Sequence, residues 1–157
     1  MAEKISILEQ RRIEGAIVKD IFAEIVQSSG QEAARDIIAR AVRRSARNAG
    51  RQLAGRMGGG DLTKFLAILP LWQQDEALKI QFEIQSPREL TYRVTDCAYA
   101  RMYREMGLAH LGFLLSCSRD GAFMEGFAPQ AELTRTQTIM EGGSYCDFCY
   151  RLKTETV

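Results

Sequence analysis

The spacing of hydrophobic and polar positions divides the chain near residue 77. In residues 3–77 apolar side chains recur every three or four positions, the period of amphipathic helices. The first predicted helix carries isoleucine at every fourth position, and three other apolar residues widen the stripe: Ile13, Ile17, Ile21 and Ile25, with Val18, Phe22 and Val26. We expect this stripe to face the core.

Breaks in the pattern mark the helix ends. Ser28-Ser29-Gly30 ends the first helix, and a second runs from about Gln31 to Gly58-Gly59-Gly60. Asp61 is a suitable N-cap for a third helix, which Pro70 kinks or ends. The first 77 residues are therefore predicted to form three helices.

From residue 78 the period changes to two. Residues 78–85 alternate apolar and polar, and the alternation resumes after Ser86-Pro87-Arg88, which predicts a β-hairpin. Residues 98–117 return to helical spacing, with a break expected at Gly107. Residues 131–140 and 146–152 alternate again and predict two more strands.

This order of elements predicts an α+β fold. N-terminal helices are followed by a β-β-α-β-β antiparallel sheet covered by helices on one face. We expect one domain over residues 1–157, with a helical part at 1–77 and an α+β part at 78–157. A length of 157 residues with 46% apolar side chains is enough for a single core.

Net charge and segment composition exclude several classes of function. A net charge of +1 gives no global field that would recruit nucleic acid or an anionic membrane. No run approaches the roughly 18 apolar residues of a membrane helix, and residues 1–5 show no secretion signal. We therefore expect a cytoplasmic protein without a membrane partner, whose cysteines are not in disulfides.

Seven arginines in the second helix form the strongest local charge. They lie between residues 35 and 56, opposed in that window only by Asp36. A solvated face balanced by acids elsewhere is the preferred interpretation, and contact with an anionic partner is the alternative. Because no aromatic residues separate the arginines, a nucleic-acid partner is not expected.

Residues 97–149 hold all four cysteines and the single histidine. In a regular strand Cys146 and Cys149 point to opposite faces, which argues against a Cys-x-x-Cys redox or zinc motif. A straight helix over residues 98–117 would hold Cys97 and Cys117 about 30 Å apart. A break at Gly107 would let the chain double back and bring them together.

A cysteine in this segment has three possible roles: nucleophile, metal ligand or buried apolar residue. A thiol with a reference pKa near 8.5 needs a positive neighbour or a base to react at neutral pH. Arg135 and His110 are candidates for that neighbour. Asp120 or Asp147 would orient a base or hold a substrate amino or amidine group. The alternative for His110 is an ordinary helix residue.

Several motifs in this segment, taken in order, resemble one known family. They are Cys97; Gly107; Cys117-Ser118-Arg119-Asp120; Phe127-Ala128-Pro129; Leu133-Thr134-Arg135-Thr136-Gln137-Thr138-Ile139-Met140-Glu141-Gly142; and Cys146-Asp147-Phe148. Together they resemble the L-2-amino-thiazoline-4-carboxylic acid hydrolase family. The resemblance covers about residues 75–152, and no motif in the helical half contributes to it.

The resemblance implies hydrolytic opening of a thiazoline ring to a carbamoyl-cysteine product. Carbon 2 of that ring is amidine-like and electrophilic, so Cys146 would attack it, with Cys117 as the alternative or supporting thiol. Asp120 or Asp147 would bind the protonated amidine or move protons. These four residues are the expected catalytic set.

Four further positions are expected to contact the substrate. Arg135 would pair with its carboxylate, although an internal ion pair with Asp120 or Asp147 is an equal alternative. Thr138 would donate to the developing tetrahedral centre. Cys97 and His110 complete this set.

The sequence thus predicts a hydrolase that opens a carbon–nitrogen bond in a small cyclic amidine or amide. The alternative is a non-catalytic module that senses a small ligand or metal. No cofactor is predicted, and a metal ion is possible but has no motif to support it. The wide apolar stripe of the first helices also predicts a homo-oligomer.

Overall fold

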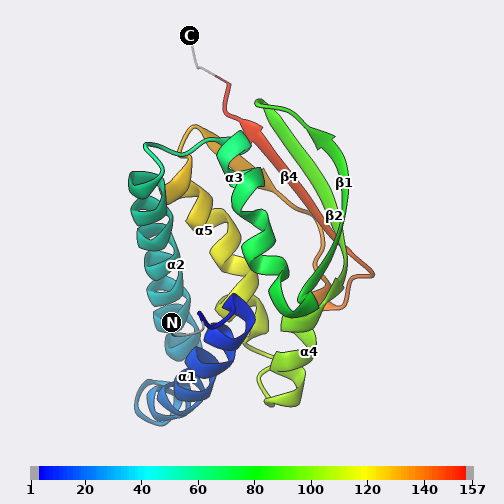
Figure 1. The fold of residues 1–157 in the computed structure, drawn as a ribbon. Coiled ribbons are helices and arrows are strands. Elements are labelled where there is room, and N and C mark those ends of the chain that lie inside the picture. Colours follow the sequence, from blue (N-terminus) through cyan, green and yellow to red (C-terminus); the bar gives the residue numbers. More distant parts are fainter. Residues whose placement is uncertain (1–3, 155–157) are drawn as a thin grey trace.

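The computed structural model describes residues 4–154. Its elements are, in order, α1 (Ile7–Ser29), α2 (Gln31–Arg56), α3 (Leu62–Ile68), η1 (Leu69–Glu76), β1 (Leu78–Gln85), β2 (Glu89–Cys97), α4 (Ala98–Glu105), η2 (Phe113–Cys117), α5 (Ser118–Phe127), β3 (Ala131–Thr134), η3 (Ile139–Glu141) and β4 (Cys146–Leu152). The strands form one antiparallel sheet in the order β1-β2-β4-β3. Helices cover one face of this sheet, so the predicted α+β class is confirmed (Figure 1).

The helix boundaries follow from local chemistry. The Ser6 hydroxyl accepts a hydrogen bond from the amide of Glu9 at the start of α1, and Gly30 ends that helix at a φ of 87°. The Asp61 carboxylate caps α3 in the same way. At Pro70 the α-helical path tightens into the 3₁₀ turn η1. The breaks predicted at Gly30, Asp61 and Pro70 are confirmed.

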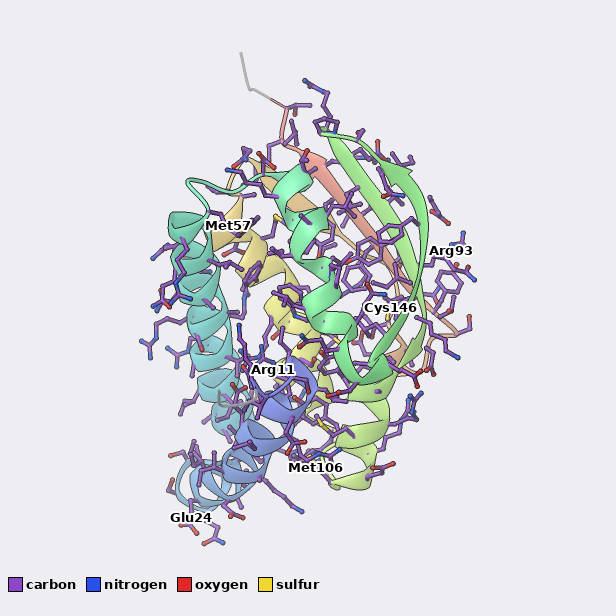
Figure 2. The ribbon with its side chains drawn as sticks, in the orientation of Figure 1. Arg11, Glu24, Met57, Arg93, Met106 and Cys146 are labelled. Atoms are coloured by element: carbon purple, nitrogen blue, oxygen red, sulfur yellow. The ribbon has the colours of Figure 1, made fainter. Side chains whose placement is uncertain are left out.

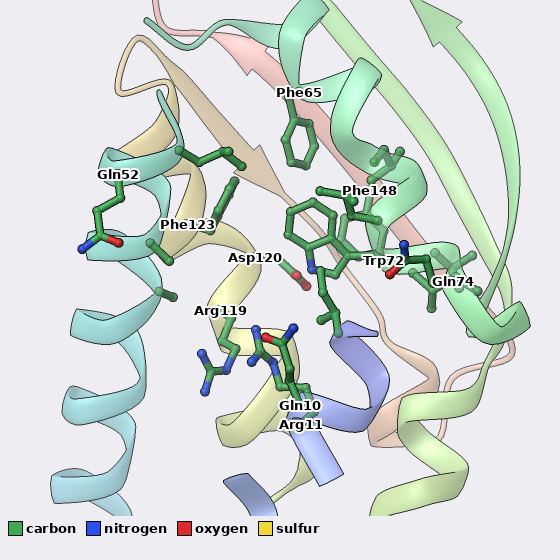
Figure 3. Close-up of a pocket in the computed structure, with 18 of the residues that line it drawn as sticks. Gln10, Arg11, Gln52, Phe65, Trp72, Gln74, Arg119, Asp120, Phe123 and Phe148 are labelled. Carbon is green, nitrogen blue, oxygen red and sulfur yellow. The ribbon is translucent and has the colours of Figure 1, made fainter. Parts of the chain in front are cut away.

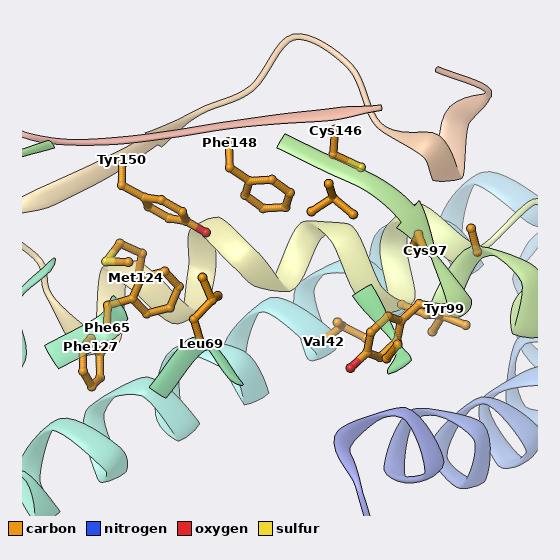
Figure 4. Close-up of a cluster of buried hydrophobic side chains, with 14 of the residues drawn as sticks. Val42, Phe65, Leu69, Cys97, Tyr99, Met124, Phe127, Cys146, Phe148 and Tyr150 are labelled. Carbon is orange, nitrogen blue, oxygen red and sulfur yellow. The ribbon is translucent and has the colours of Figure 1, made fainter. Parts of the chain in front are cut away.

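Alternation along β4 places its side chains as expected. Cys146, Phe148 and Tyr150 are buried on the face that meets α5. Asp147 and Cys149 lie on the other face and are partly exposed. Figure 4 shows the three buried side chains extending from the strand toward α5. The prediction that Cys146 and Cys149 point apart is confirmed.

The strand predicted over residues 131–140 is wrong beyond Thr134. The amides of Thr136 and Gln137 donate to the Asp147 carboxylate and so do not continue a strand ladder. Residues 139–141 then form the 3₁₀ turn η3, where the hydroxyl of Thr138 accepts a hydrogen bond from the amide of Glu141. Local side-chain acceptors therefore outcompete the strand pairing that the threonine-rich pattern favours.

The apolar stripe of α1 is only partly buried. Phe22 lies in the core, but Ile13, Ile17 and Ile21 are 56%, 58% and 44% exposed. Ile13, Ile17 and Ile21 thus form an exposed ridge on α1, not the core face expected from the sequence, whereas Ile25 packs against the core. The predicted homo-oligomer stays a prediction, and this ridge is one apolar surface that it could use.

Helices α2 and α5 lie backbone to backbone through glycine. A Cβ atom added at Gly126 of α5 would lie 2.0 Å from the carbonyl oxygen of Arg47. One added at Gly50 of α2 would lie 2.3 Å from the carbonyl oxygen of Phe123. Only glycine allows this approach, which sets how deeply α5, and with it Asp120, lies between α2 and the sheet.

Candidate functional site

Three of the four cysteines line one small cavity. Cys97 comes from the end of β2, Cys117 from the end of η2, and Cys146 from the start of β4. Asp120 and Arg135 line the same cavity, whose volume is about 60 Å³. Cys146 is buried, and in Figure 2 its label lies over the sheet. The thiols that the sequence separates by up to 49 positions therefore share one site.

A chain reversal after α4 brings Cys117 back to Cys97. Helix α4 ends at Glu105, and Gly107 follows with a φ of 71°, the left-handed conformation expected for a helix end. The chain then enters a π-helical turn over residues 113–117. Such wide turns are often found at functional sites. Here the turn ends at Cys117 and leads directly into the first turn of α5, which carries Asp120.

Arg135 is held by an ion pair at the wall of the cavity. Its Nη1 lies 2.7 Å from Oδ2 of Asp120, and its Nη2 donates to the carbonyl of Cys117 at 3.0 Å. The guanidinium also lies 4.8 Å from the centre of the Phe148 ring. Of the two roles expected for Arg135, the geometry matches the internal ion pair with Asp120.

Replacing Arg135 by glutamine is expected to destabilise the fold more at neutral pH than in acid. Burial raises the pKa of Asp120, and Arg135 opposes that rise. Without the arginine, the pKa of Asp120 in the folded protein rises further. The free energy of unfolding therefore falls as the pH rises from the pKa of Asp120 in the unfolded chain to its higher pKa in the folded protein. We expect a loss of about 3 kcal/mol near pH 7.5 and a smaller loss near pH 4, measured by urea unfolding.

Arg93→Gln is the matched control, because the Arg93–Glu83 pair is exposed. Its loss should stay within about 0.5 kcal/mol at both pH values. Equal destabilisation of Arg135→Gln at pH 4 and pH 7.5 would show that Asp120 is not the group whose charge Arg135 balances.

The three thiols are buried and reluctant to ionise. Burial raises the pKa of Cys97 to about 11. Burial raises the pKa of Cys117 still more, with the charge of Asp120 adding to the effect. Burial also raises the pKa of Cys146, but there the amide of Ile139 donates to the sulfur at 3.2 Å, and Arg135 adds a positive charge. Cys146 is therefore the thiol that combines an amide hydrogen bond with the positive charge of Arg135.

Asp120 is the carboxylate available to take a proton in this cavity. Among the residues described, it is the only acid in the lining. Arg135 donates to its Oδ2, and 27% of the side chain remains exposed. Burial raises the pKa of Asp120 above its ordinary value, although Arg135 opposes that rise.

Three of the expected site residues lie elsewhere. Asp147 is on the other face of β4, where its carboxylate accepts from the amides of Thr136 and Gln137 and from the Thr136 hydroxyl. Thr138 is buried and donates to Glu141. His110 is exposed in the loop after α4 and packs edge-on against Phe22. The structure does not bring these three to the cavity.

Asp147→Asn is expected to weaken the fold without changing the chemistry of the cavity. Burial alone would raise the pKa of Asp147, but hydrogen bonds from Thr136 and Gln137 hold it below its usual range. The Asp147 carboxylate therefore contributes to the free energy of unfolding above its pKa in the unfolded chain. This contribution is lost as the pH falls through its pKa in the folded protein. We expect about 1 kcal/mol less stability at pH 7, with kcat within about twofold of wild type. A loss of turnover comparable to that of Asp120→Asn would return Asp147 to the catalytic set.

A larger pocket opens beside the cysteine cavity. Its volume is about 330 Å³, and it shares part of its wall with the cavity, including Asp120, Arg119, Arg11, Trp72 and Phe148. Figure 3 shows the Asp120 carboxylate in the middle of this pocket, with Arg11 and Arg119 on one side and aromatic rings on the other.

The sequence did not predict this pocket. Two of its residues could have been noted from the sequence: Trp72 is the only tryptophan in the chain, and Arg119 lies inside the Cys117–Asp120 motif. Their convergence depends on the packing of η1 and α1 against α5, which spacing along the chain does not reveal.

The described part of the chain has neither a cluster of metal ligands nor a membrane-spanning helix. Within residues 4–154 no three or more His, Cys, Asp or Glu side chains are grouped so that they could hold a metal ion. Among the helices of the same residues, none has the length and apolar character needed to cross a bilayer.

With this geometry established, comparison with known proteins assigns the family. The model of the family named L-2-amino-thiazoline-4-carboxylic acid hydrolase matches residues 10–150. The chain belongs to this family. The match includes α2 and α3 and most of α1, so the helical half, which contributed no motif to the resemblance, is part of the family's domain as well.

Other comparisons bear on the fold. No curated protein matches the sequence. A crystal structure of the phenol-responsive sensory domain of the transcription activator PoxR with phenol is 17% identical, with a TM-score of 0.52, and the match covers 96% of this chain and 78% of that one. An unliganded Fe(II) H-NOX protein from K. algicida is 12% identical with a TM-score of 0.43, and the match covers 79% and 65% of the two chains. The first likeness shows that this hydrolase family member shares its fold with a sensory domain.

Proposed function

We propose that this protein is a hydrolase that opens a carbon–nitrogen bond in a small cyclic amidine or amide, as the family name implies for an amino-thiazoline carboxylate. The observation that carries the proposal is the cavity in which Cys97, Cys117 and Cys146 meet a single carboxylate, Asp120. Family membership supports the hydrolytic class. The thiol and the acid supply a nucleophile and a proton carrier within one enclosed space.

In the first step Cys146 attacks the amidine-like carbon of the protonated ring, and the ring C=N double bond becomes a single bond whose nitrogen already carries one hydrogen. Its S–H proton passes to Asp120 as the S–C bond forms, because burial raises the pKa of the thiol and keeps it protonated at neutral pH. Asp120 then returns this proton to the ring nitrogen as the C–N bond breaks. The amide of Ile139, which already donates to the sulfur at 3.2 Å, stabilises the thiolate as it develops.

In the second step water releases the product. Asp120 accepts a proton from the water molecule as its oxygen attacks the carbon bound to Cys146. The bond between this carbon and the Cys146 sulfur breaks, and the proton on Asp120 returns to that sulfur. The proton that the amidine carried leaves to solvent as the carbamoyl product forms. Arg135 stabilises the Asp120 carboxylate throughout and is a positioning residue, because its guanidinium is occupied by Asp120 and the Cys117 carbonyl.

Incubation with L-2-amino-thiazoline-4-carboxylate tests the proposal. We expect disappearance of the ring together with a new primary amine, which is the group freed when the ring C–N bond breaks. A new free thiol with no new amine would mean that the C–S bond breaks instead, and would overturn the bond assignment. No turnover of this compound or of related cyclic amidines would overturn the hydrolase proposal.

A second candidate function is binding of a small ligand without chemistry. The apolar pocket of about 330 Å³ favours it, and the fold is shared with a domain described as phenol-responsive. This candidate predicts saturable ligand binding that survives Cys146→Ala and Asp120→Asn, with no product formed by the wild-type protein.

A further inference from the structure

The pocket beside the cysteine cavity is larger and more aromatic than opening a five-membered ring requires. Six aromatic side chains line it: Phe65, Trp72, Tyr92, Phe123, Phe148 and Tyr150. The rings of Trp72 and Phe123 meet edge to face, with centroids 5.3 Å apart, and Phe65 packs on Tyr150 at 5.0 Å. Walls of this kind favour a flat apolar group.

The charge of the same pocket is positive. Its lining includes Lys4, Arg11, Arg56 and Arg119, and among the described residues the only acid in it is Asp120, which is already paired with Arg135. This arrangement favours an anionic group on the ligand.

Arg11 and Arg119 are the cations that line both the pocket and the cysteine cavity. Both contact one carboxylate, that of Glu14, at 2.9 Å each. Their side chains are only 16% and 15% exposed, so they are held in place and not free in solvent. Two guanidinium groups that share one carboxylate keep donors for a second acid.

We infer that this pocket binds an aryl-substituted carboxylic acid, with its ring among Trp72, Phe65 and Phe123 and its carboxylate on Arg11 and Arg119. For the reacting end the inference rests on the proposed function: a cyclic amidine attached to this acid would reach the cysteines past Asp120, where the two cavities share a wall. The substrate class is therefore a larger and more apolar acid than amino-thiazoline carboxylate itself.

Trp72, the only tryptophan of the chain, reports directly on occupancy of this pocket. Titration with 3-phenylpropionate should give a saturable change in its fluorescence. The neutral 3-phenylpropionamide and the ringless propionate should each bind at least about tenfold more weakly, because each lacks one of the two recognised groups. Calorimetry on the same samples decides the result if the fluorescence does not change.

Arg11→Gln and Phe123→Leu test the acid and ring contacts separately, and Arg44→Gln is the control. Arg11→Gln should reduce the preference for the acid over the amide by about tenfold and leave binding of the amide unchanged. Arg44→Gln removes an exposed arginine of α2 that is not part of this pocket, and should have no effect. Phe123→Leu should weaken binding of the acid and the amide alike.

Failure of this inference differs from failure of the proposed function. If 3-phenylpropionate does not bind, or binds no better than its amide and propionate, the inference is wrong even when the thiazoline is opened. If the acid binds as described while no cyclic amidine is turned over, the inference stands and the hydrolase proposal fails.

Discussion

Replacement of Cys146 by alanine is expected to lower the turnover of a cyclic amidine by about 10³-fold or more, with little change in the fold. Cys146 is the buried thiol that receives both an amide hydrogen bond, from Ile139, and the positive charge of Arg135. Removing the sulfur removes the nucleophile, whereas Cys97 and Cys117 lack that combination of partners. Steady-state kinetics with the amino-thiazoline carboxylate measures the effect.

Cys149→Ala is the matched control for this experiment. Cys149 lies on the same strand, three residues away, but on the opposite face, where its sulfur accepts from the Thr91 hydroxyl at 3.8 Å. Its loss should change kcat by less than about twofold. Turnover that survives Cys146→Ala together with Cys117→Ala would show that hydrolysis does not proceed through a thiol.

Gly126→Ala is expected to destabilise the fold by about 3 kcal/mol or more, although it adds a single methyl group. The added Cβ would lie 2.0 Å from the carbonyl oxygen of Arg47, which is backbone and has no flexible way to withdraw. Helix α5 would have to move away from α2 and would carry Asp120 with it. Thermal and urea unfolding measure the loss.

Gly55→Ala in α2 is the matched control, and we expect it to stabilise the fold. Nothing lies within 4 Å of a Cβ at that position, so alanine should raise the stability of α2 by up to about 1 kcal/mol through its greater helix propensity. Equal stability of the Gly126→Ala and Gly55→Ala variants would mean that the close packing of α2 and α5 is not what fixes the position of Asp120.

The elements of the fold were largely predictable because their signals are local. Gly30 and Pro70 interrupt helices for backbone reasons that hold in any context, and Gly107 marks the chain reversal that brings Cys117 to Cys97. The strand over residues 131–140 was wrong beyond Thr134, because the Asp147 carboxylate captures the amides of Thr136 and Gln137. That competition depends on a residue at least ten positions away along the chain.

The candidate site was predictable only in part for the same reason. Cys117, Asp120 and Arg135 stand out from motif order, but the choice of an internal ion pair over substrate binding for Arg135 needed three dimensions. The π-helical turn before Cys117 leaves no mark in the hydrophobic period. Arg11 lies in α1, far along the chain from the Cys117–Asp120 motif that it joins, so no local pattern points to it.

A covalent intermediate on Cys146 is the most direct test of the hydrolase account. Wild-type protein mixed with L-2-amino-thiazoline-4-carboxylate and quenched in acid within the first turnover should carry a substrate-derived adduct, and peptide mapping should place it on Cys146. The adduct should form and decay at rates that match product release. Full product formation with no adduct on any cysteine would contradict the account, and an adduct on Cys97 or Cys117 alone would contradict the choice of nucleophile.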